Sequence, residues 1–200
     1  VLLTSYPAAK KYLNYDALEL QQFLPGATIF KNGKSQTIGD PLRSASLLLP
    51  TLISSVGTFS DKIKILQLNA FLKKKTLAKI FKTDEKSTLN YLQDFGFSMD
   101  MIQTFFKPFF SGIFLEPNLE TSSRMLQDGS EIKNHFTIIA TEASHLVTNL
   151  KNQETIWKSC DTIYFETKNR NIQKPIIGLI ADEKALINNI FYHTSIETSA

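Results

Sequence analysis

Residues 96–125 constrain the fold of this chain more than any other stretch, reading GFSMDMIQTFFKPFFSGIFLEPNLETSSRM. Ser98 is a good helix N-cap, because its hydroxyl can accept an N–H of the first turn, and Asp100 suits the positive helix end. Apolar residues then recur at helical spacing through positions 101–106, and we expect Pro108 to stop the run. These residues predict a core helix that ends in a buried aromatic cluster.

The composition is that of an ordinary globular protein, with 42% hydrophobic and 20% charged residues in 200 positions, enough for one or two domains. A net charge of +3 is too small to indicate nucleic-acid binding. The single cysteine, Cys160, fits a reducing cytoplasm. We therefore expect a cytoplasmic protein, with peripheral membrane contact as the alternative. Val1 opens directly in an apolar run, so we also expect this chain to be an excerpt of a longer protein.

A hairpin and a block of helices are predicted for the first 111 residues. The pair Asn32-Gly33 favours a tight two-residue turn, which predicts a hairpin between 28–30 and 36–38. Further elements are expected as a strand at 1–4 and helices at 7–13, 44–54, 59–71, 77–81 and 87–95.

The helix ends and faces are also read from the pattern. We expect Ser60 to cap the helix at 59–71, and Ser87 to cap the one at 87–95, which Gly96 closes. The apolar stripe that should face the core in the helix at 59–71 consists of Ile63, Leu66, Ala70 and Phe71.

After residue 125 the pattern changes. Asp128-Gly129 marks a turn, which predicts the end of a hairpin at 126–133. The β-branched run at 136–140 is typical of a strand buried on both faces, and a helix is predicted at 142–150. Further elements are expected as strands at 162–165, 176–180 and 189–193, with a turn at 182–185. The fold class is therefore α+β with a mixed sheet.

Common catalytic and metal patterns are absent from the sequence. His135, His145 and His193 have no second His, Cys or carboxylate cluster at metal-ligand spacing, so we expect no metal site. No G-x-S-x-G is present, which disfavours a hydrolase or transferase of α/β type. There is also no G-x-G-x-x-G, the glycine turn that cradles a pyrophosphate.

The order of several segments resembles the flavin-containing amine oxidase superfamily. The nearest likeness is to the protoporphyrinogen-oxidase-like and phytoene-desaturase-like bacterial FAD-dependent oxidoreductases. The helix at 98–106, F-x-P-F-F-x-G-I-F at 106–114, an acidic–Pro turn and S-S-R-M at 122–125 resemble their substrate-domain segment. F-T-I-I-A-T-E at 136–142 resembles their strand and corner near the FAD adenosine, with Glu142 where Gly or Pro is usual.

Two more segments extend the resemblance over nearly the whole chain. Residues 1–7, with Tyr15-Asp-Ala, Pro25-Gly26 and Asp40-Pro41, resemble the segment after the Gly-Gly-Arg turn that contacts FAD. Residues 55–62 resemble the entry to the substrate-domain helices. In the relatives, several dozen more residues stand between the counterparts of Met125 and Leu126. We therefore expect this junction to be a splice or an omission.

The resemblance implies a partial two-domain flavoprotein with a parent α/β fold of the NAD(P)-binding Rossmann-like type. Residues 1–40 would form the strand, short helix and hairpin at the domain junction, and 41–125 the helical substrate-domain block. Residues 126–150 would belong to the FAD-binding domain and 151–200 to the substrate-domain sheet. The implied activity is transfer of a hydride from a C–N or C–C bond of a small hydrophobic substrate to FAD.

The same resemblance places Ala140 and Thr141 nearest to FAD. The rings that would line a hydrophobic substrate cavity are Phe105, Phe106, Phe109, Phe110 and Phe114, each with packing between domains as its other role. No catalytic acid or base is identified. Without the glycine turn, we expect the 200-residue chain alone not to hold FAD.

A non-enzymatic helical interaction module is the alternative function. It would use the helices of 47–81 and the basic run Lys73–Lys75, which reads either as a solvated helix face or as a surface for a membrane.

Overall fold

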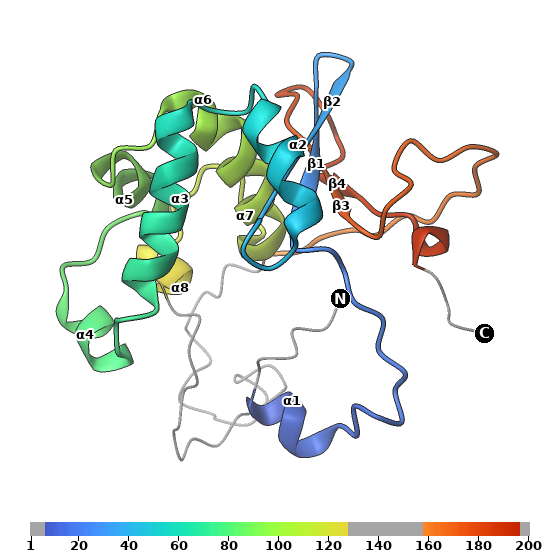
Figure 1. The fold of residues 1–200 in the computed structure, drawn as a ribbon. Helices are drawn as coiled ribbons and strands as arrows, with labels where there is room; N and C mark the ends of the chain where they lie inside the picture. The colour runs from blue at the N-terminus through green and yellow to red at the C-terminus, as the bar shows by residue number, and fades with distance from the viewer. Residues whose placement is uncertain (1–6, 128–157, 197–200) are drawn as a thin grey trace, which may run out of the picture.

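The computed structural model describes residues 7–127 and 158–196, in which helices lie beside a mixed β-sheet (Figure 1). The predicted α+β class is therefore confirmed. In chain order the elements are α1 (Pro7–Tyr12), β1 (Gly26–Lys31), β2 (Lys34–Gly39), a 3₁₀ turn (Ala45–Leu47), α2 (Leu48–Ile53), α3 (Phe59–Leu72), α4 (Leu77–Lys82), α5 (Thr88–Asp94), α6 (Met99–Met101), a π-helical turn (Ile102–Phe106), α7 (Lys107–Phe114), α8 (Ser123–Gln127), β3 (Ile177–Ile180), β4 (Asn189–Ile190) and a 3₁₀ turn (His193–Ser195).

Some predicted elements lie outside the described residues. They are the strand at 1–4, the hairpin residues 128–133, the strand at 136–140 and the helix at 142–150.

The sheet combines two strands from the early part of the described chain with two from its last part. Its strand order is β2-β1-β3-β4, with β1 antiparallel to β2, parallel to β3, and β3 antiparallel to β4. Asn32 and Gly33 have φ values of 51° and 71°, the positive angles that a two-residue hairpin turn requires. The predicted hairpin and the mixed sheet are confirmed. The predicted junction segment 1–40 and the predicted sheet segment 151–200 thus contribute strands to one sheet.

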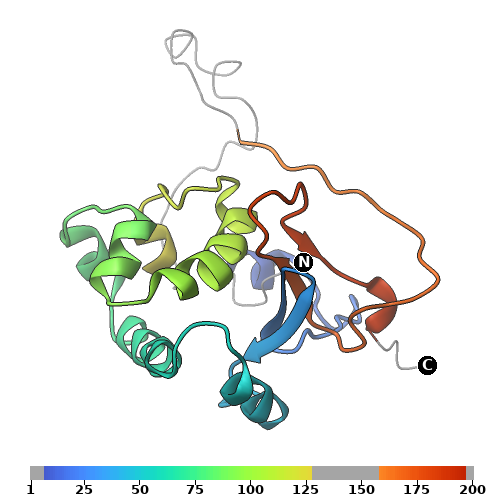
Figure 2. The ribbon, with the colours of Figure 1, turned by 90° about the horizontal axis from the view of Figure 1, so that it is seen from above.

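The helical block and the sheet share a main hydrophobic core, and a smaller cluster of Leu47, Ile172 and Ile176 lies apart from it. Figure 2 shows α7 between the sheet and the helices α5 and α8, and α7 contacts β3 and β4 while the π-helical turn contacts β1. The buried apolar residues of this core come from both layers: Ala27, Ile29, Ile38, Val56, Leu68, Leu92, Phe97, Met101, Ile102, Phe106, Leu119 and Leu179. The π-helical turn and α7 therefore pack the helical block against the sheet.

The helix that begins after Ser98 does not stop at Pro108, contrary to the prediction. It continues from α6 through the π-helical turn into α7 and ends at Leu115, which has φ 53°. Proline lacks the N–H that an α-helix interior would use. Here the wider turn precedes it, with the Lys107 N–H bonded to the Ile102 carbonyl, and Pro108 falls in the first turn of α7, where proline is tolerated.

The helix α3 differs from the prediction in its cap and in its buried face. Thr58, not Ser60, is the N-cap, and its side chain exchanges hydrogen bonds with Asp61 in a capping box. The expected stripe of Ile63, Leu66, Ala70 and Phe71 lies at the surface. The inward face carries Leu68, with Ile65 and Leu72 packed against the core.

Smaller differences concern element ends. The helix expected at 44–54 is a 3₁₀ turn followed by α2, and β4 covers two residues of the predicted strand at 189–193. Leu126 and Gln127 belong to α8 instead of a hairpin, since the Ser122 hydroxyl accepts the Arg124 N–H and starts a helical turn. Residues 162–165 form no strand, and three of their side chains are more than two-thirds exposed: Ile163, Tyr164 and Phe165.

In the described part of the chain, every helix is too short or too polar to cross a membrane.

Candidate functional site

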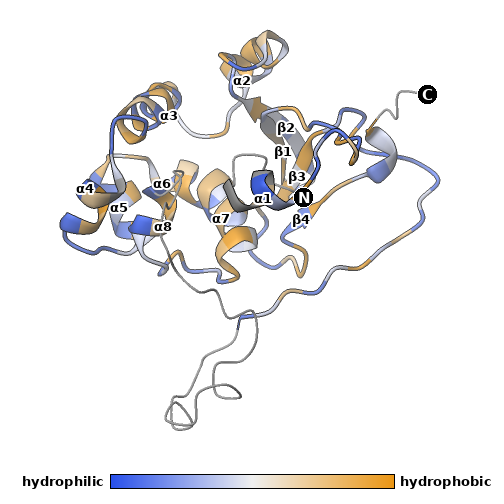
Figure 3. Cartoon of the chain, turned by 90° about the horizontal axis from the view of Figure 1, so that it is seen from below, coloured by the Kyte–Doolittle hydropathy of each residue, from blue (hydrophilic) through white to orange (hydrophobic). Residues whose placement is uncertain are grey.

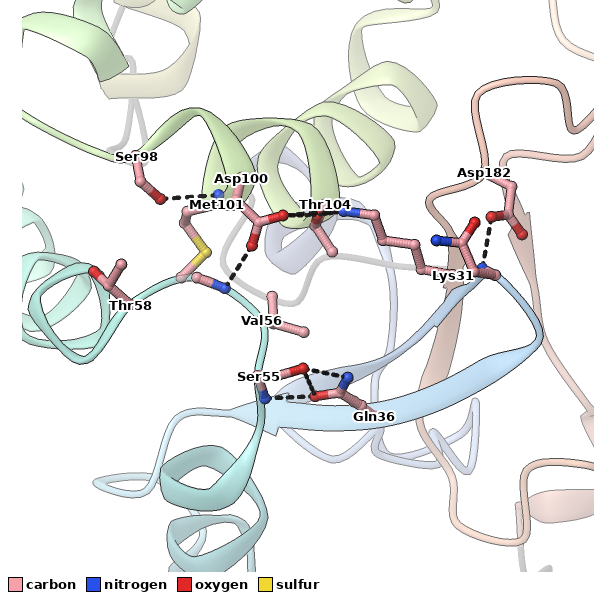
Figure 4. A network of polar contacts seen from close by, with 12 residues as sticks. Lys31, Gln36, Ser55, Val56, Thr58, Ser98, Asp100, Met101, Thr104 and Asp182 are labelled. Atoms are coloured by element: carbon pink, nitrogen blue, oxygen red, sulfur yellow. Dashed lines mark hydrogen bonds and ion pairs between the residues drawn. The ribbon is translucent and has the colours of Figure 1, made fainter.

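A polar junction fixes the helical block against the end of β1 (Figure 4). Lys31 Nζ donates to Asp100 Oδ1 at 3.0 Å and to Thr104 Oγ1 at 2.7 Å, and the Gly57 N–H donates to Asp100 Oδ2 at 3.2 Å. Burial alone would raise the pKa of Asp100, but the bonds from Lys31 and Gly57 hold it below its ordinary value. Asp100 is therefore a charged anchor between layers.

A second junction fixes the loop between α2 and α3 to strand β2. Gln36 Oε1 accepts the Ser55 N–H at 2.6 Å and the Ser54 hydroxyl at 3.1 Å, while Gln36 Nε2 lies 2.7 Å from the Ser55 hydroxyl (Figure 4). On the other side of the hairpin, the Asn32 N–H donates to Asp182 Oδ1 at 2.7 Å. These contacts hold the loop, the hairpin and the last strands in position.

Asp61 is fully buried and links the starts of two helices. Its Oδ2 accepts the Thr58 N–H, the Thr58 hydroxyl and the Ser98 hydroxyl, each at 2.7 Å, and its Oδ1 accepts the Ser98 N–H at 2.8 Å. Burial alone would raise the pKa of Asp61, but the N–H groups of Ser98 and Thr58 and their hydroxyls lower it to about 2. The carboxylate is charged and structural.

The aromatic run predicted to line a substrate cavity forms a stack of rings. Phe110 stacks on Phe106 at 6.1 Å and on Phe114 at 5.0 Å between centroids, and Phe105 stacks on Phe109 at 5.8 Å. Phe106 and Phe114 are buried, and the other three rings are half-buried. None of the five lines the cleft of about 520 Å³ around Lys75 and Tyr91, or the one of about 280 Å³ around Gln103 and Asn118. In this part of the chain they act as packing between layers, and their cavity role stays a prediction.

The larger cleft, of about 520 Å³, lies between the ends of α3, α4, α5 and α8. The residues that line it are Phe71, Lys75, Lys82, Thr83, Asp84, Lys86, Tyr91, Asp94, Phe95, Ser123 and Gln127. Lys75 Nζ lies 4.5 Å from the centre of the Phe71 ring and donates to Gln127 Oε1 at 2.7 Å. Burial lowers the pKa of Lys75.

Tyr91 adds a second polar group to this cleft. Its hydroxyl is buried and has no hydrogen-bond partner among the described residues, and burial raises the pKa of Tyr91. Ring faces, the Tyr91 hydroxyl, three lysines and two aspartates therefore line one cleft. No sequence pattern indicates this cleft, because Lys75 stands in a basic run and its partner Gln127 is 52 residues away.

The remaining candidate residues are placed as follows. Ala140 and Thr141 lie outside the described residues, as do His135 and His145. His193 lies in a 3₁₀ turn with its ring 5.1 Å from that of Phe191, and Cys160 is exposed. Over residues 7–127 and 158–196, no cluster of His, Cys, Asp or Glu could hold a metal ion.

Three helix starts among the described residues have side-chain caps. A dinucleotide pyrophosphate needs free backbone N–H groups at a helix start behind a glycine turn. At α3, α5 and α6 the caps Thr58, Ser87 and Ser98 already accept first-turn N–H groups. At these three helix starts, one of the N–H groups that a pyrophosphate could use is therefore already bonded.

Compared with known proteins, the chain matches no family model, no curated protein and no solved structure.

Proposed function

We propose that this chain is the substrate-side part of an FAD-dependent oxidoreductase of the flavin amine oxidase superfamily. The supporting observation is the segment 98–125, which combines the order of residues typical of that family with a position between the helical block and the sheet. In such an enzyme the flavin accepts a hydride from a C–N or C–C bond of a hydrophobic substrate. This chain would contribute one wall of the substrate cavity and the packing contact that holds the domains together.

The proposal assigns no catalytic residue to the described part of the chain. The two carboxylates that join elements in that part, the buried Asp61 and the exposed Asp100, hold helix starts and strand ends in place. Ala140 and Thr141 are proposed to approach the FAD adenosine, because small residues at the end of the strand predicted at 136–140 would let the backbone come close to a ligand.

The test is expression of the complete reading frame that encodes this chain, beside the 200-residue chain itself. We expect the complete protein to be yellow, with stoichiometric flavin released on denaturation, and the 200-residue chain to be colourless. In the complete protein, Thr141→Trp should reduce flavin content, whereas Thr167→Trp, at an exposed position, should not. A complete reading frame without a glycine-rich dinucleotide turn, giving a colourless protein, would refute the proposal.

A non-enzymatic helical interaction module is the second candidate function. One observation favours it: α2 and α3 expose large apolar side chains on the side away from the core, among them Ile53 and Phe59. An apolar surface of this kind commonly marks an interaction site. It is compatible with the oxidoreductase proposal, since it uses other residues.

A further inference from the structure

The charges of this chain are segregated by sequence region. Residues 41–82, which form α2, α3 and α4 and are here called the basic helical segment, contain eight Lys or Arg and one acidic residue, Asp61. The rest of the chain contains fourteen Lys or Arg and eighteen Asp or Glu. The segment therefore carries +7, eight minus one, while the remainder carries −4.

All charges at the surface of the basic helical segment are positive. Its single acid, Asp61, is 0% exposed and is bonded to Thr58 and Ser98. Within the described residues, no ion pair joins any of its eight cations to a carboxylate. Its exposed cations are Arg43, Lys73, Lys74, Lys79 and Lys82.

The same segment carries a ridge of exposed apolar side chains. The apolar ridge consists of Leu48, Leu49, Leu52 and Ile53 of α2 and Phe59, Ile63 and Leu66 of α3, each between 42% and 75% exposed. On α3 these positions recur at i, i+4 and i+7, opposite the inward face of Leu68 and Leu72. Figures 2 and 3 place α2 and α3 along the same outer side of the molecule.

We infer that the apolar ridge docks onto a lipid bilayer surface that contains anionic headgroups. Bulky aliphatic and aromatic side chains would enter the boundary between headgroups and acyl chains, and Lys73 and Lys74, which directly follow α3, would meet lipid phosphates and carboxylates. Lysine stems can lie along the apolar layer while their ammonium groups stay in the headgroup region. This inference rests on the second candidate function and names its partner; it does not involve flavin.

Two observations favour lipid over other occupants. A second copy of this chain would bring two +7 segments together, and like charges at an interface are repelled. A peptide partner usually binds in a groove, yet neither the cleft around Lys75 nor the one around Gln103 is lined by a ridge residue. A bilayer requires only an exposed apolar surface with cations around it.

The test is co-sedimentation of the 200-residue chain with vesicles of phosphatidylcholine alone or of phosphatidylcholine mixed with phosphatidylserine. We expect binding to the mixed vesicles, weaker binding to the neutral ones, and a loss of binding as salt is added. The double variant Ile63→Ser/Leu66→Ser should weaken binding by about tenfold, because it removes apolar insertion. Lys73→Glu/Lys74→Glu should weaken it by at least about tenfold.

Matched control variants test whether vesicle binding is specific to the basic helical segment. Leu186→Ser and Lys184→Glu change an apolar and a basic residue that are also exposed but lie outside the basic helical segment, and should leave binding unchanged. The helical circular dichroism of every variant should match that of the unchanged chain, since exposed positions are altered. Absence of vesicle binding, equal binding to neutral vesicles, or self-association without vesicle binding would overturn the inference. None of these outcomes affects the flavin measurement.

Discussion

Replacement of Asp61 by Asn tests how the helical block is held together. The change keeps the size of the side chain and one accepting oxygen, but it removes the charge and turns an amide N–H₂ toward groups that are donors. Four donors from Thr58 and Ser98 surround this side chain, so at least one of them loses its acceptor. An unpaired buried donor costs about 1–3 kcal/mol.

The lowered pKa gives the size of the charge effect. A fall from the ordinary value of 3.8 to about 2 corresponds to about 2.5 kcal/mol in favour of the charged folded form, at about 1.36 kcal/mol per pKa unit. Because the two contributions overlap, we expect Asp61→Asn to lower the free energy of unfolding by about 2–4 kcal/mol at neutral pH. Urea unfolding followed by helical circular dichroism measures this difference.

The pH dependence follows from the direction of the same pKa. Since the folded pKa lies below the unfolded one, the stabilisation is complete above about pH 4 and is lost as the pH falls toward 2. The unchanged chain should therefore lose stability across this range more steeply than Asp61→Asn. As a control, Asp94→Asn breaks an exposed pair with Lys86 and should cost less than about 1 kcal/mol. Equal losses for the two variants, or equal slopes between pH 4 and 2, would refute the assigned role of Asp61.

Two further predictions use the same urea assay. Phe106→Ala should lower the free energy of unfolding by about 3–5 kcal/mol, because its ring is only 5% exposed. Phe81→Ala removes a ring that is 58% exposed and should cost less than about 1 kcal/mol. Similar losses for the two variants would contradict the packing role of the Phe106 ring. Gly178→Ala would bring a Cβ within 2.7 Å of two isoleucine side chains and should lower the free energy of unfolding by about 1–3 kcal/mol. In Gly33→Ala the new Cβ meets no atom within 4 Å, so the cost is that of an alanine in the left-handed conformation, about 1 kcal/mol. A smaller loss at Gly178 than at Gly33 would contradict the packing of β3.

The elements predicted correctly depend on signals only a few residues apart. The Asn32-Gly33 turn, the caps Ser87 and Ser98, and the glycine end at Gly96, with φ 91°, were all confirmed. Each of these devices satisfies backbone groups within one helical or hairpin turn, so the sequence contains both partners side by side. The helical block from residue 41 to 111 followed from their spacing.

Features that join distant residues could not be predicted in this way. The parallel pairing of β1 with β3 sets Ala27 beside Ile177, and no local pattern specifies which strand lies next to which. The cleft around Lys75 and Tyr91 likewise forms only when α5 and α8 meet. Pro108 does not end the helix, because the π-helical turn before it places the proline in the first turn of α7, where its missing N–H breaks no hydrogen bond.

The orientation of α3 shows how one buried charge decides what the surface presents. The helix has apolar residues on two faces, and hydrophobicity alone favours burying Ile63 and Leu66 while Asp61 faces water. The opposite orientation is stable because the N–H and hydroxyl groups of Thr58 and Ser98 replace the water that Asp61 loses. Turning Asp61 inward also turns Leu68 inward and leaves Ile63 and Leu66 outside. The contact that joins two helix starts is therefore also the one that creates the apolar ridge.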